Sequence, residues 1–323
     1  MKSKWENPKC NFCGSSEYEV VYDNFIEWAY EGKFGIVKCK NCDLCFTSPR
    51  PIPSEIGKYY EASSYYGREM THKEQTEKNI KERDAAFSTL YELIAQFKKT
   101  GRILDIGAGI GMMLSKYKDD GWDAQGIEIS PEAVKFAKIQ YKLRLRQGDF
   151  FDFSFQKNSF DVIVLNNALE HLYNPQETID RVYALLKDGG LIVVAVPNCE
   201  SLGRKIFEKK WLGWQPPRHL YHFSAKTLAN MFIHAGFKNL HVAYNYTTQN
   251  KYSLFQSLRY AYSPKFQKKS GGGLMKTDTS IKNGKINMNV ELGKIAGNVF
   301  ASIGAFIEPA LCLGEIIIVY VQK

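Results

Sequence analysis

A glycine-rich segment near residue 105 constrains the fold of this chain more than any other feature of its sequence. The apolar residues Ile103 and Leu104 lead to Asp105, and the chain continues through residues 106–111 with the sequence IGAGIG. A short apolar run followed by alternating glycines is typical of a buried strand that ends in a tight loop and leads into a helix. Because glycine has no Cβ, the backbone of such a loop can approach a ligand closely. The segment therefore predicts a binding site for a nucleotide-like cofactor.

The spacing of these glycines distinguishes between two kinds of cofactor. A dinucleotide fingerprint, G-x-G-x-x-G, needs its third glycine at position 112, where this chain has Met112. The pattern that does match is acidic-x-Gly-x-Gly-x-Gly, led by Asp105. It resembles the first motif of the Rossmann-like methyltransferases that use S-adenosylmethionine. That cofactor has no pyrophosphate, and its sulfonium and amino groups suit a nearby carboxylate.

Strands and helices alternate regularly after this loop. Five strands are expected at residues 102–106, 123–129, 143–147, 160–165 and 191–196, each followed by a helical segment. A sixth strand is expected at 240–246, and the apolar β-branched run 315–321 predicts an antiparallel seventh strand at the edge. Such alternation indicates a sheet covered by helices on both faces. The predicted fold class is α/β: a Rossmann-like seven-stranded methyltransferase sheet, mostly parallel, with a small N-terminal zinc ribbon.

Two cysteine pairs near the N-terminus predict the ribbon. Cys10 and Cys13 form one C-x-x-C unit, and Cys39 and Cys42 form the other. Each unit offers two thiolates to one tetrahedral ion, and four sulfurs leave no open position for catalysis. We therefore expect structural zinc. Buried or redox-active cysteines are the alternative, and Cys45 can take the place of Cys42 as a ligand.

Polar residues follow the ends of successive strands, where open α/β sheets bind their ligands. Asp105 and the glycine backbone are expected to face the methionine part, Glu128 the ribose hydroxyls, and Asp149 the adenine amino group with Phe150 alongside. Asn166 is expected near the amino acid or the reacting methyl group. Each of these residues also suits an ordinary turn or cap. The full predicted cofactor set is Asp105, Gly107, Ala108, Gly109, Gly111, Glu128, Ile129, Asp149, Phe150 and Asn166.

Residues 102–196 as a whole resemble a class I S-adenosylmethionine-dependent methyltransferase, and the sequence LEHL at residues 169–172 resembles a signature found after the fourth strand of many small-molecule members. With the ribbon, the chain resembles a bacterial subgroup linked to sugar or polysaccharide modification. Sugar C-methyltransferases of that subgroup carry a Glu-His pair where this chain has Arg218 and His219, which argues against C-methylation. His171 and His219 are the candidate general bases. Tethering a loop and capping or packing at a helix are their alternative roles.

The sequence divides into four parts. We expect a zinc ribbon at 1–55, a helical linker at 56–100, and a methyltransferase domain at 101–246 plus 315–323. The insertion at 247–314 is expected to be a lid, a dimer element or a membrane-surface element, since long insertions in compact domains tend to be functional.

Charge and the N-terminal sequence limit the partners that we expect. The net charge of +9 favours an anionic acceptor such as a nucleotide sugar or a lipid-linked sugar. The basic residues form no long run, which argues against nucleic acid. The first residues lack an apolar segment of the signal-peptide type, so a cytoplasmic protein is expected. Peripheral contact with a membrane and a homodimer are two separate expectations.

The function predicted from these features is O-methylation of a nucleotide-linked or glycan sugar. An RNA or protein methyltransferase that uses the ribbon for recognition is the alternative within enzymes. A binding protein without catalysis is the alternative outside them.

Overall fold

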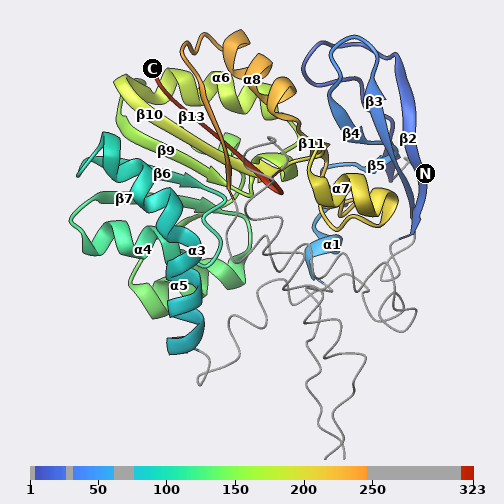
Figure 1. Cartoon of the computed structure of the whole chain (residues 1–323). Coiled ribbons are helices and arrows are strands. Elements are labelled where there is room, and N and C mark those ends of the chain that lie inside the picture. The colour runs from blue at the N-terminus through green and yellow to red at the C-terminus, as the bar shows by residue number, and fades with distance from the viewer. Residues whose placement is uncertain (1–3, 27–31, 62–75, 246–313) are drawn as a thin grey trace, which may run out of the picture.

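The computed structural model describes residues 4–26, 32–61, 76–245 and 314–323 (Figure 1). The predicted insertion at 247–314 lies outside the described residues except for Gly314, so its role stays a prediction.

A seven-stranded sheet forms the centre of the molecule. Its strand order is β12-β13-β10-β9-β6-β7-β8, and β13 runs antiparallel to both of its neighbours while β6 to β10 are parallel to one another. The strands are β6 (Arg102–Ile106), β7 (Asp123–Glu128), β8 (Arg146–Gln147), β9 (Phe160–Asn166), β10 (Leu186–Pro197), β12 (His241–Asn245) and β13 (Ile316–Gln322). This arrangement confirms the predicted fold class. The prediction that the antiparallel seventh strand lies at the edge is wrong: β13 lies between β10 and β12 and pairs with both, and β12 forms the edge.

The third predicted strand is shorter than expected. Only Arg146 and Gln147 pair with β7, as β8. Leu143 and Leu145, which the sequence placed in the same strand, are buried core side chains beside the glycines at 111 and 126. These leucines pack at the edge of the sheet without extending its hydrogen-bonded ladder.

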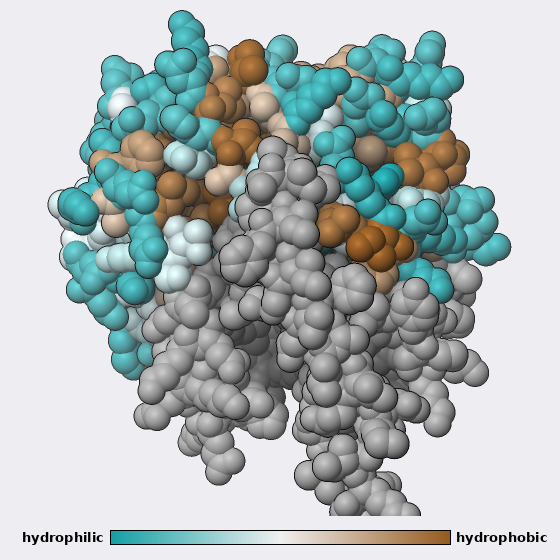
Figure 2. Space-filling model, viewed as in Figure 1, coloured by the Kyte–Doolittle hydropathy of each residue, from teal (hydrophilic) through white to brown (hydrophobic). Residues whose placement is uncertain are grey.

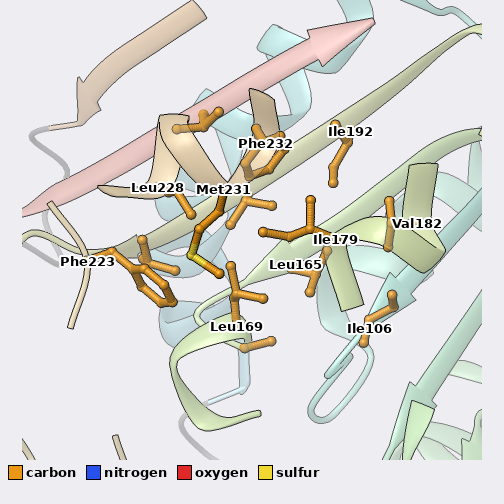
Figure 3. Packing of buried hydrophobic residues seen from close by; sticks show 14 of the residues in the cluster. Ile106, Leu165, Leu169, Ile179, Val182, Ile192, Phe223, Leu228, Met231 and Phe232 are labelled. Atoms are coloured by element: carbon orange, nitrogen blue, oxygen red, sulfur yellow. The ribbon is translucent and has the colours of Figure 1, made fainter. Parts of the chain in front are cut away.

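Helices cover both faces of this sheet because its inner strands present apolar side chains to each side. In β10, Ile192 and Val194 belong to one hydrophobic cluster, while Leu191 and Val193 belong to the other. The first cluster is covered by α6 (Pro175–Leu185) and α8 (Ala225–His234), and the second by α3 (Thr76–Phe97), α4 (Met112–Asp119) and α5 (Pro131–Tyr141). Figure 3 shows residues of α6 and α8 meeting those of the sheet: Ile179, Val182, Leu228, Met231, Phe232, Leu165 and Ile192.

The N-terminal segment forms a second, four-stranded sheet that is completed by a strand from residues 221–222, far along the sequence. Its order is β11-β4-β3-β2, with β2 (Tyr18–Ile26), β3 (Lys33–Cys39), β4 (Cys45–Thr47) and β11 (Tyr221–His222). A short pair, β1 (Trp5–Glu6) and β5 (Arg50–Pro51), lies beside it (Figure 1). Val37, Leu44 and Phe46 belong to the same hydrophobic cluster as α6 and α8. The ribbon therefore shares both a sheet and a core with the methyltransferase part.

Short elements complete the described chain. They are α1 (Lys58–Glu61), α7 (Leu202–Phe207) and the 3-10 turns η2 (Phe150–Asp152), η3 (Leu169–His171) and η4 (Glu208–Lys210). Hydrophilic side chains dominate the described surface in Figure 2, with hydrophobic ones in smaller groups between them. Within the described residues, no helix combines the length and apolar character needed to cross a membrane.

Candidate active site and cysteine cluster

The glycine loop lies at the carboxyl end of β6, held by the neighbouring strand. The backbone N–H groups of Gly107 and Ala108 both donate to the carbonyl of Ile127, at 2.9 Å. Gly107 has a φ of 78°, and a Cβ at this position would lie 2.7 Å from the Cβ of Ala168. The loop thus fits between β7 and the segment after β9 only because position 107 lacks a side chain.

Glu128 is the last residue of β7, and its side chain binds the backbone of the glycine loop. Its Oε2 accepts a hydrogen bond from the N–H of Gly109 at 2.8 Å, and its Oε1 accepts one from the N–H of Ser130 at 2.9 Å. The residue is 5% exposed, whereas Ile129 beside it is 62% exposed. A buried carboxylate next to an exposed apolar side chain suits a ligand with both a hydroxyl-bearing ring and a flat apolar ring.

Asp105 is the most unusual carboxyl group of this loop. It is 3% exposed, and its Oδ1 has no hydrogen-bond partner among the described residues. Burial, together with repulsion from Glu128, raises the pKa of Asp105 to about 7. A cationic ligand group placed beside this oxygen would remove both penalties.

The residues after β8 differ in part from the expectation. The side chain of Asp149 accepts a hydrogen bond from the N–H of Phe151 at 2.8 Å, and so caps η2. Phe150, expected alongside the adenine, is 2% exposed and lies in the core beneath Arg181, whose guanidinium is 4.3 Å from the ring centre. The aromatic ring at this turn that reaches the surface belongs to Phe151, which is 37% exposed.

Asn166 ends β9 in the middle of the same sheet edge. Its Oδ1 accepts a hydrogen bond of 3.3 Å from the side-chain amide of Asn167, a residue with a φ of 50°. In the ladder, Asn166 lies opposite Ala195 of β10. The predicted cofactor residues thus lie at, or just after, the carboxyl ends of β9, β6, β7 and β8, which are neighbours in the sheet in this order. Their contacts with a cofactor stay a prediction.

The structure brings His171 and His219 together, although they are 48 positions apart in the sequence. Their ring centres are 4.7 Å apart, and the rings meet edge to face. The Nδ1 of His171 is 3.0 Å from the carbonyl oxygen of Arg218, and the Nδ1 of His219 is 2.8 Å from the carbonyl oxygen of Gly213. A carbonyl oxygen can only accept, so each Nδ1 carries the proton and each Nε2 keeps its lone pair.

Burial perturbs every ionisable group of this pair and its neighbour. It lowers the pKa of His171 to about 4 and holds the pKa of His219 well below its usual value. Repulsion from the charged form of the nearby His171 lowers the pKa of His219 further. Glu170, beside His171 in η3, is 1% exposed, and burial raises its pKa to about 8. Clustered groups with perturbed pKa values are typical of functional sites.

Tyr60 lies at the site but is not among the predicted site residues. Its hydroxyl lies 3.0 Å from the Nδ1 of His171, whereas Tyr59 is buried against Trp5 and Phe34 of the N-terminal segment. Two adjacent tyrosines in the sequence indicate packing between the ribbon and the catalytic domain or a cover over an adenine or a substrate. The sequence could not show which ring would reach the histidine pair.

The four predicted cysteines converge at the base of the ribbon. The Sγ atoms of Cys10 and Cys42 are 3.4 Å apart, those of Cys13 and Cys39 are 3.5 Å apart, and all four lie within 4.8 Å of one another. Tetrahedral zinc with Zn–S bonds of about 2.3 Å requires sulfurs roughly 3.8 Å apart. Cys45 lies outside this cluster; its thiol contacts the carbonyl of Asp43.

Comparison with known proteins agrees with this fold and loop. The model of a methyltransferase domain family matches residues 77–242, just over half of the chain. The chain belongs to this methyltransferase family. Together with the fold and the glycine loop, the match makes it an S-adenosylmethionine-dependent methyltransferase.

Individual relatives are distant. An uncharacterized protein of Methanocaldococcus jannaschii is 28% identical over 168 residues, which cover 52% of this chain and 79% of that protein. An uncharacterized methyltransferase of Staphylococcus carnosus is 32% identical over 114 residues, 33% of this chain and 54% of that protein, so the alignment spans about half of this relative. Among solved structures, phosphoethanolamine N-methyltransferase 2 of Haemonchus contortus aligns with a TM-score of 0.50 at 16% identity, covering 86% of this chain and 62% of that one. The last likeness concerns the fold alone.

Proposed function

We propose that this methyltransferase methylates a hydroxyl group of a sugar, carried by a nucleotide or a glycan. The observation that supports this most is the His171–His219 pair. His171 follows β9, the sheet neighbour of β6, which leads into the glycine loop, and the Nε2 atoms of both rings keep their lone pairs. A hydroxyl acceptor must lose a proton during methyl transfer, and a neutral imidazole can take it. An amine acceptor has less need of such a group.

The residues at the carboxyl ends of β6 and β7 fit S-adenosylmethionine. Asp105 offers an unpaired buried oxygen to its ammonium group, Glu128 offers a carboxylate to the ribose hydroxyls, and Ile129 offers an exposed apolar surface to the adenine. When bound, S-adenosylmethionine supplies a methyl group on a cationic sulfur. The chain's own contribution is to align the acceptor oxygen with that methyl group and to exclude water, from which much of the rate is expected.

In the proposed step, a C–O bond forms to the acceptor as the C–S bond breaks, and the hydroxyl proton passes to the Nε2 of His171 or His219. The backbone carbonyls of Arg218 and Gly213 orient these rings through their Nδ1–H groups. Tyr60 contacts the Nδ1 of His171 and so helps to fix that ring.

The acceptor is proposed to be anionic, because the chain has a net charge of +9 and Arg218 lies next to the histidine pair. A guanidinium binds phosphate oxygens in a two-pronged geometry. A nucleotide sugar or a lipid-linked sugar combines the required hydroxyl with the required phosphate. We also propose a homodimer and peripheral contact with a membrane surface.

The cysteine cluster is proposed to hold a structural zinc ion. Four sulfurs and no nearby carboxylate or imidazole in the cluster are the donor set that zinc prefers in closed sites. In this position the ion would join the two cysteine turns of the ribbon.

A screen of nucleotide sugars for uptake of labelled methyl groups from S-adenosylmethionine tests the proposed acceptor class. We expect uptake that resists base treatment, as an O-methyl ether does. Methylation of RNA, with binding that weakens steeply as salt is raised, would instead support the recognition role of the ribbon and contradict the sugar proposal.

Replacing Glu128 by alanine is expected to weaken binding of S-adenosylmethionine by roughly 10- to 100-fold, since hydrogen bonds to a charged group contribute about 1.5–3 kcal/mol. The change also removes the acceptor for the Gly109 N–H and so loosens the loop. Isothermal titration calorimetry measures the affinity. Glu132→Ala, an exposed carboxylate on the next helix, serves as the control; equal affinities in the two variants would contradict the ribose role.

Asp105 is expected to make both stability and cofactor binding depend on pH. Because its pKa in the folded protein is about 7, above the ordinary 3.8, the folded state keeps a proton that the unfolded chain loses between these values. The free energy of unfolding should therefore fall as pH rises through this window, by at most about 4 kcal/mol. Binding of the cationic cofactor should favour the ionised form and release a proton.

Calorimetry at pH 6.5 in buffers of different ionisation enthalpy measures that proton release. The isosteric variant Asp105→Asn should release far fewer protons and bind the cofactor more weakly. Its stability should also lack the decline between pH 4 and 7. Equal proton release by both proteins would show that another group titrates.

A further inference from the structure

A second cluster of metal-ligating side chains lies away from the cysteines, beside the proposed reaction centre. It consists of Glu170, His171 and His219, and their ligand atoms lie within 4.8 Å of one another. η3 carries the first two residues at the end of β9, and the segment before β11 carries the third. Two imidazoles and one carboxylate are a donor set that binds divalent transition metals.

The carboxylate of Glu170 indicates a missing partner. It is 1% exposed, and neither of its oxygens has a hydrogen-bond partner among the described residues. Its Oε1 lies 4.0 Å from the Nε2 of His171, too far for a hydrogen bond. Buried carboxyl groups are normally paired, and a cation is one partner that satisfies both oxygens.

The two imidazoles are oriented as metal-binding histidines are. Each directs its Nδ1–H to a backbone carbonyl, that of Arg218 for His171 and that of Gly213 for His219. This outer hydrogen bond fixes the tautomer in which Nε2 is the ligand atom, and such bonds accompany nearly all histidine ligands of metals. The hydroxyl of Tyr60 adds a further contact at the Nδ1 of His171.

We propose that Glu170, His171 and His219 bind one divalent transition-metal ion, of the class of Mn²⁺, Fe²⁺, Co²⁺ or Zn²⁺, with coordination positions left open toward the acceptor. Three protein ligands with open positions are typical of catalytic rather than structural sites. The inference deepens the proposed sugar O-methylation and rests on it for its role: a cation here would bind the acceptor hydroxyl and stabilise its ionised form. The histidines would then act as ligands, and the hydroxyl proton would pass to water.

Titration of the full-length, zinc-replete protein with Mn²⁺ tests the site, with unbound Mn²⁺ followed by electron paramagnetic resonance. Mn²⁺ prefers oxygen and nitrogen ligands, so it reports on this cluster and not on the cysteines. We expect about one bound ion per chain, with nitrogen couplings from imidazole in the spin-echo spectrum. Glu170→Gln and His219→Gln should each weaken binding by at least about 10-fold, and His241→Gln, an exposed histidine outside the cluster, should leave it unchanged.

Failure to bind Mn²⁺, absence of nitrogen couplings, or equal binding by wild type, Glu170→Gln and His219→Gln would overturn the metal site. The couplings of the wild-type protein decide the matter even if a variant fails to fold, which circular dichroism would reveal. Methyl transfer to sugars by a protein that binds no Mn²⁺ would overturn the metal site and leave the proposed function standing. Mn²⁺ bound through imidazole nitrogens, in a protein that methylates no sugar, would support the site and overturn the proposed acceptor.

Discussion

Replacement of Cys39 by serine is expected to abolish zinc binding and to destabilise the whole described fold, not the ribbon alone. Structural zinc contributes on the order of 10 kcal/mol to the folding of small zinc domains, so loss of one ligand should lower the free energy of unfolding by more than about 3 kcal/mol. For a chain of this size that corresponds to a fall in Tm of about 4–5 °C or more. Metal analysis and calorimetry measure the two effects.

The structural reason for a global effect is the shared sheet. Cys39 ends β3, which pairs with β4, and β4 pairs with β11 two residues after His219. Val37 and Phe46 of the ribbon also belong to the cluster that α6 and α8 cover. Loss of the ion should therefore disturb the histidine pair as well, and lower turnover.

Cys45→Ala is the matched control for this variant. Cys45 lies in the adjacent strand, is 9% exposed and does not belong to the four-sulfur cluster. Removing its sulfur should cost about 1 kcal/mol of packing and leave one zinc ion per chain. If Cys39→Ser kept its zinc and its Tm, the cluster would not be a metal site.

The positions of the main-sheet strands along the chain were predictable because long apolar runs and glycine turns carry their signal locally, whereas the place of β13 between β10 and β12 depends on long-range pairing. β11 was not, since a strand of two residues, Tyr221 and His222, has no periodicity to detect. It exists because β4 offers an open edge beside it. The ribbon therefore reads as a separate domain in the sequence and forms one sheet with the catalytic part in the structure.

The same distinction applies to the site. Asp105 and Glu128 were predictable because each lies at the carboxyl end of a strand, and these ends meet at one edge of a parallel sheet. Phe150 and Phe151 are neighbours of the same type, and only the geometry of η2 determines that the first is buried and the second exposed. The unpaired state of Glu170 depends on side chains distant in the sequence, so its motif alone could not reveal it.

Replacement of His219 by glutamine is expected to lower kcat by roughly 10²–10⁴-fold, the range over which a positioned proton acceptor acts. A large loss is expected in either role of the ring, as the acceptor of the hydroxyl proton or as a ligand of the cation that stabilises the ionised hydroxyl. Affinity for S-adenosylmethionine should change little, because the residues proposed to bind it lie at the carboxyl ends of β6 to β9, whereas His219 lies between β10 and β11. His171→Gln should behave in the same way, since its ring meets that of His219 at 4.7 Å. Turnover is measured with the acceptor found in the nucleotide-sugar screen.

His241→Gln is the control for the removal of a histidine elsewhere in the protein. The exposed side chain of His241 stacks on Tyr320 at the β12 edge of the sheet. It should retain full turnover. A fall in cofactor affinity as large as the fall in kcat would indicate that His219 supports the fold of the site instead of the reaction. Full turnover by both His219→Gln and His171→Gln would contradict a role in the reaction for either ring, because a ring that takes part in the reaction cannot be replaced without loss of turnover.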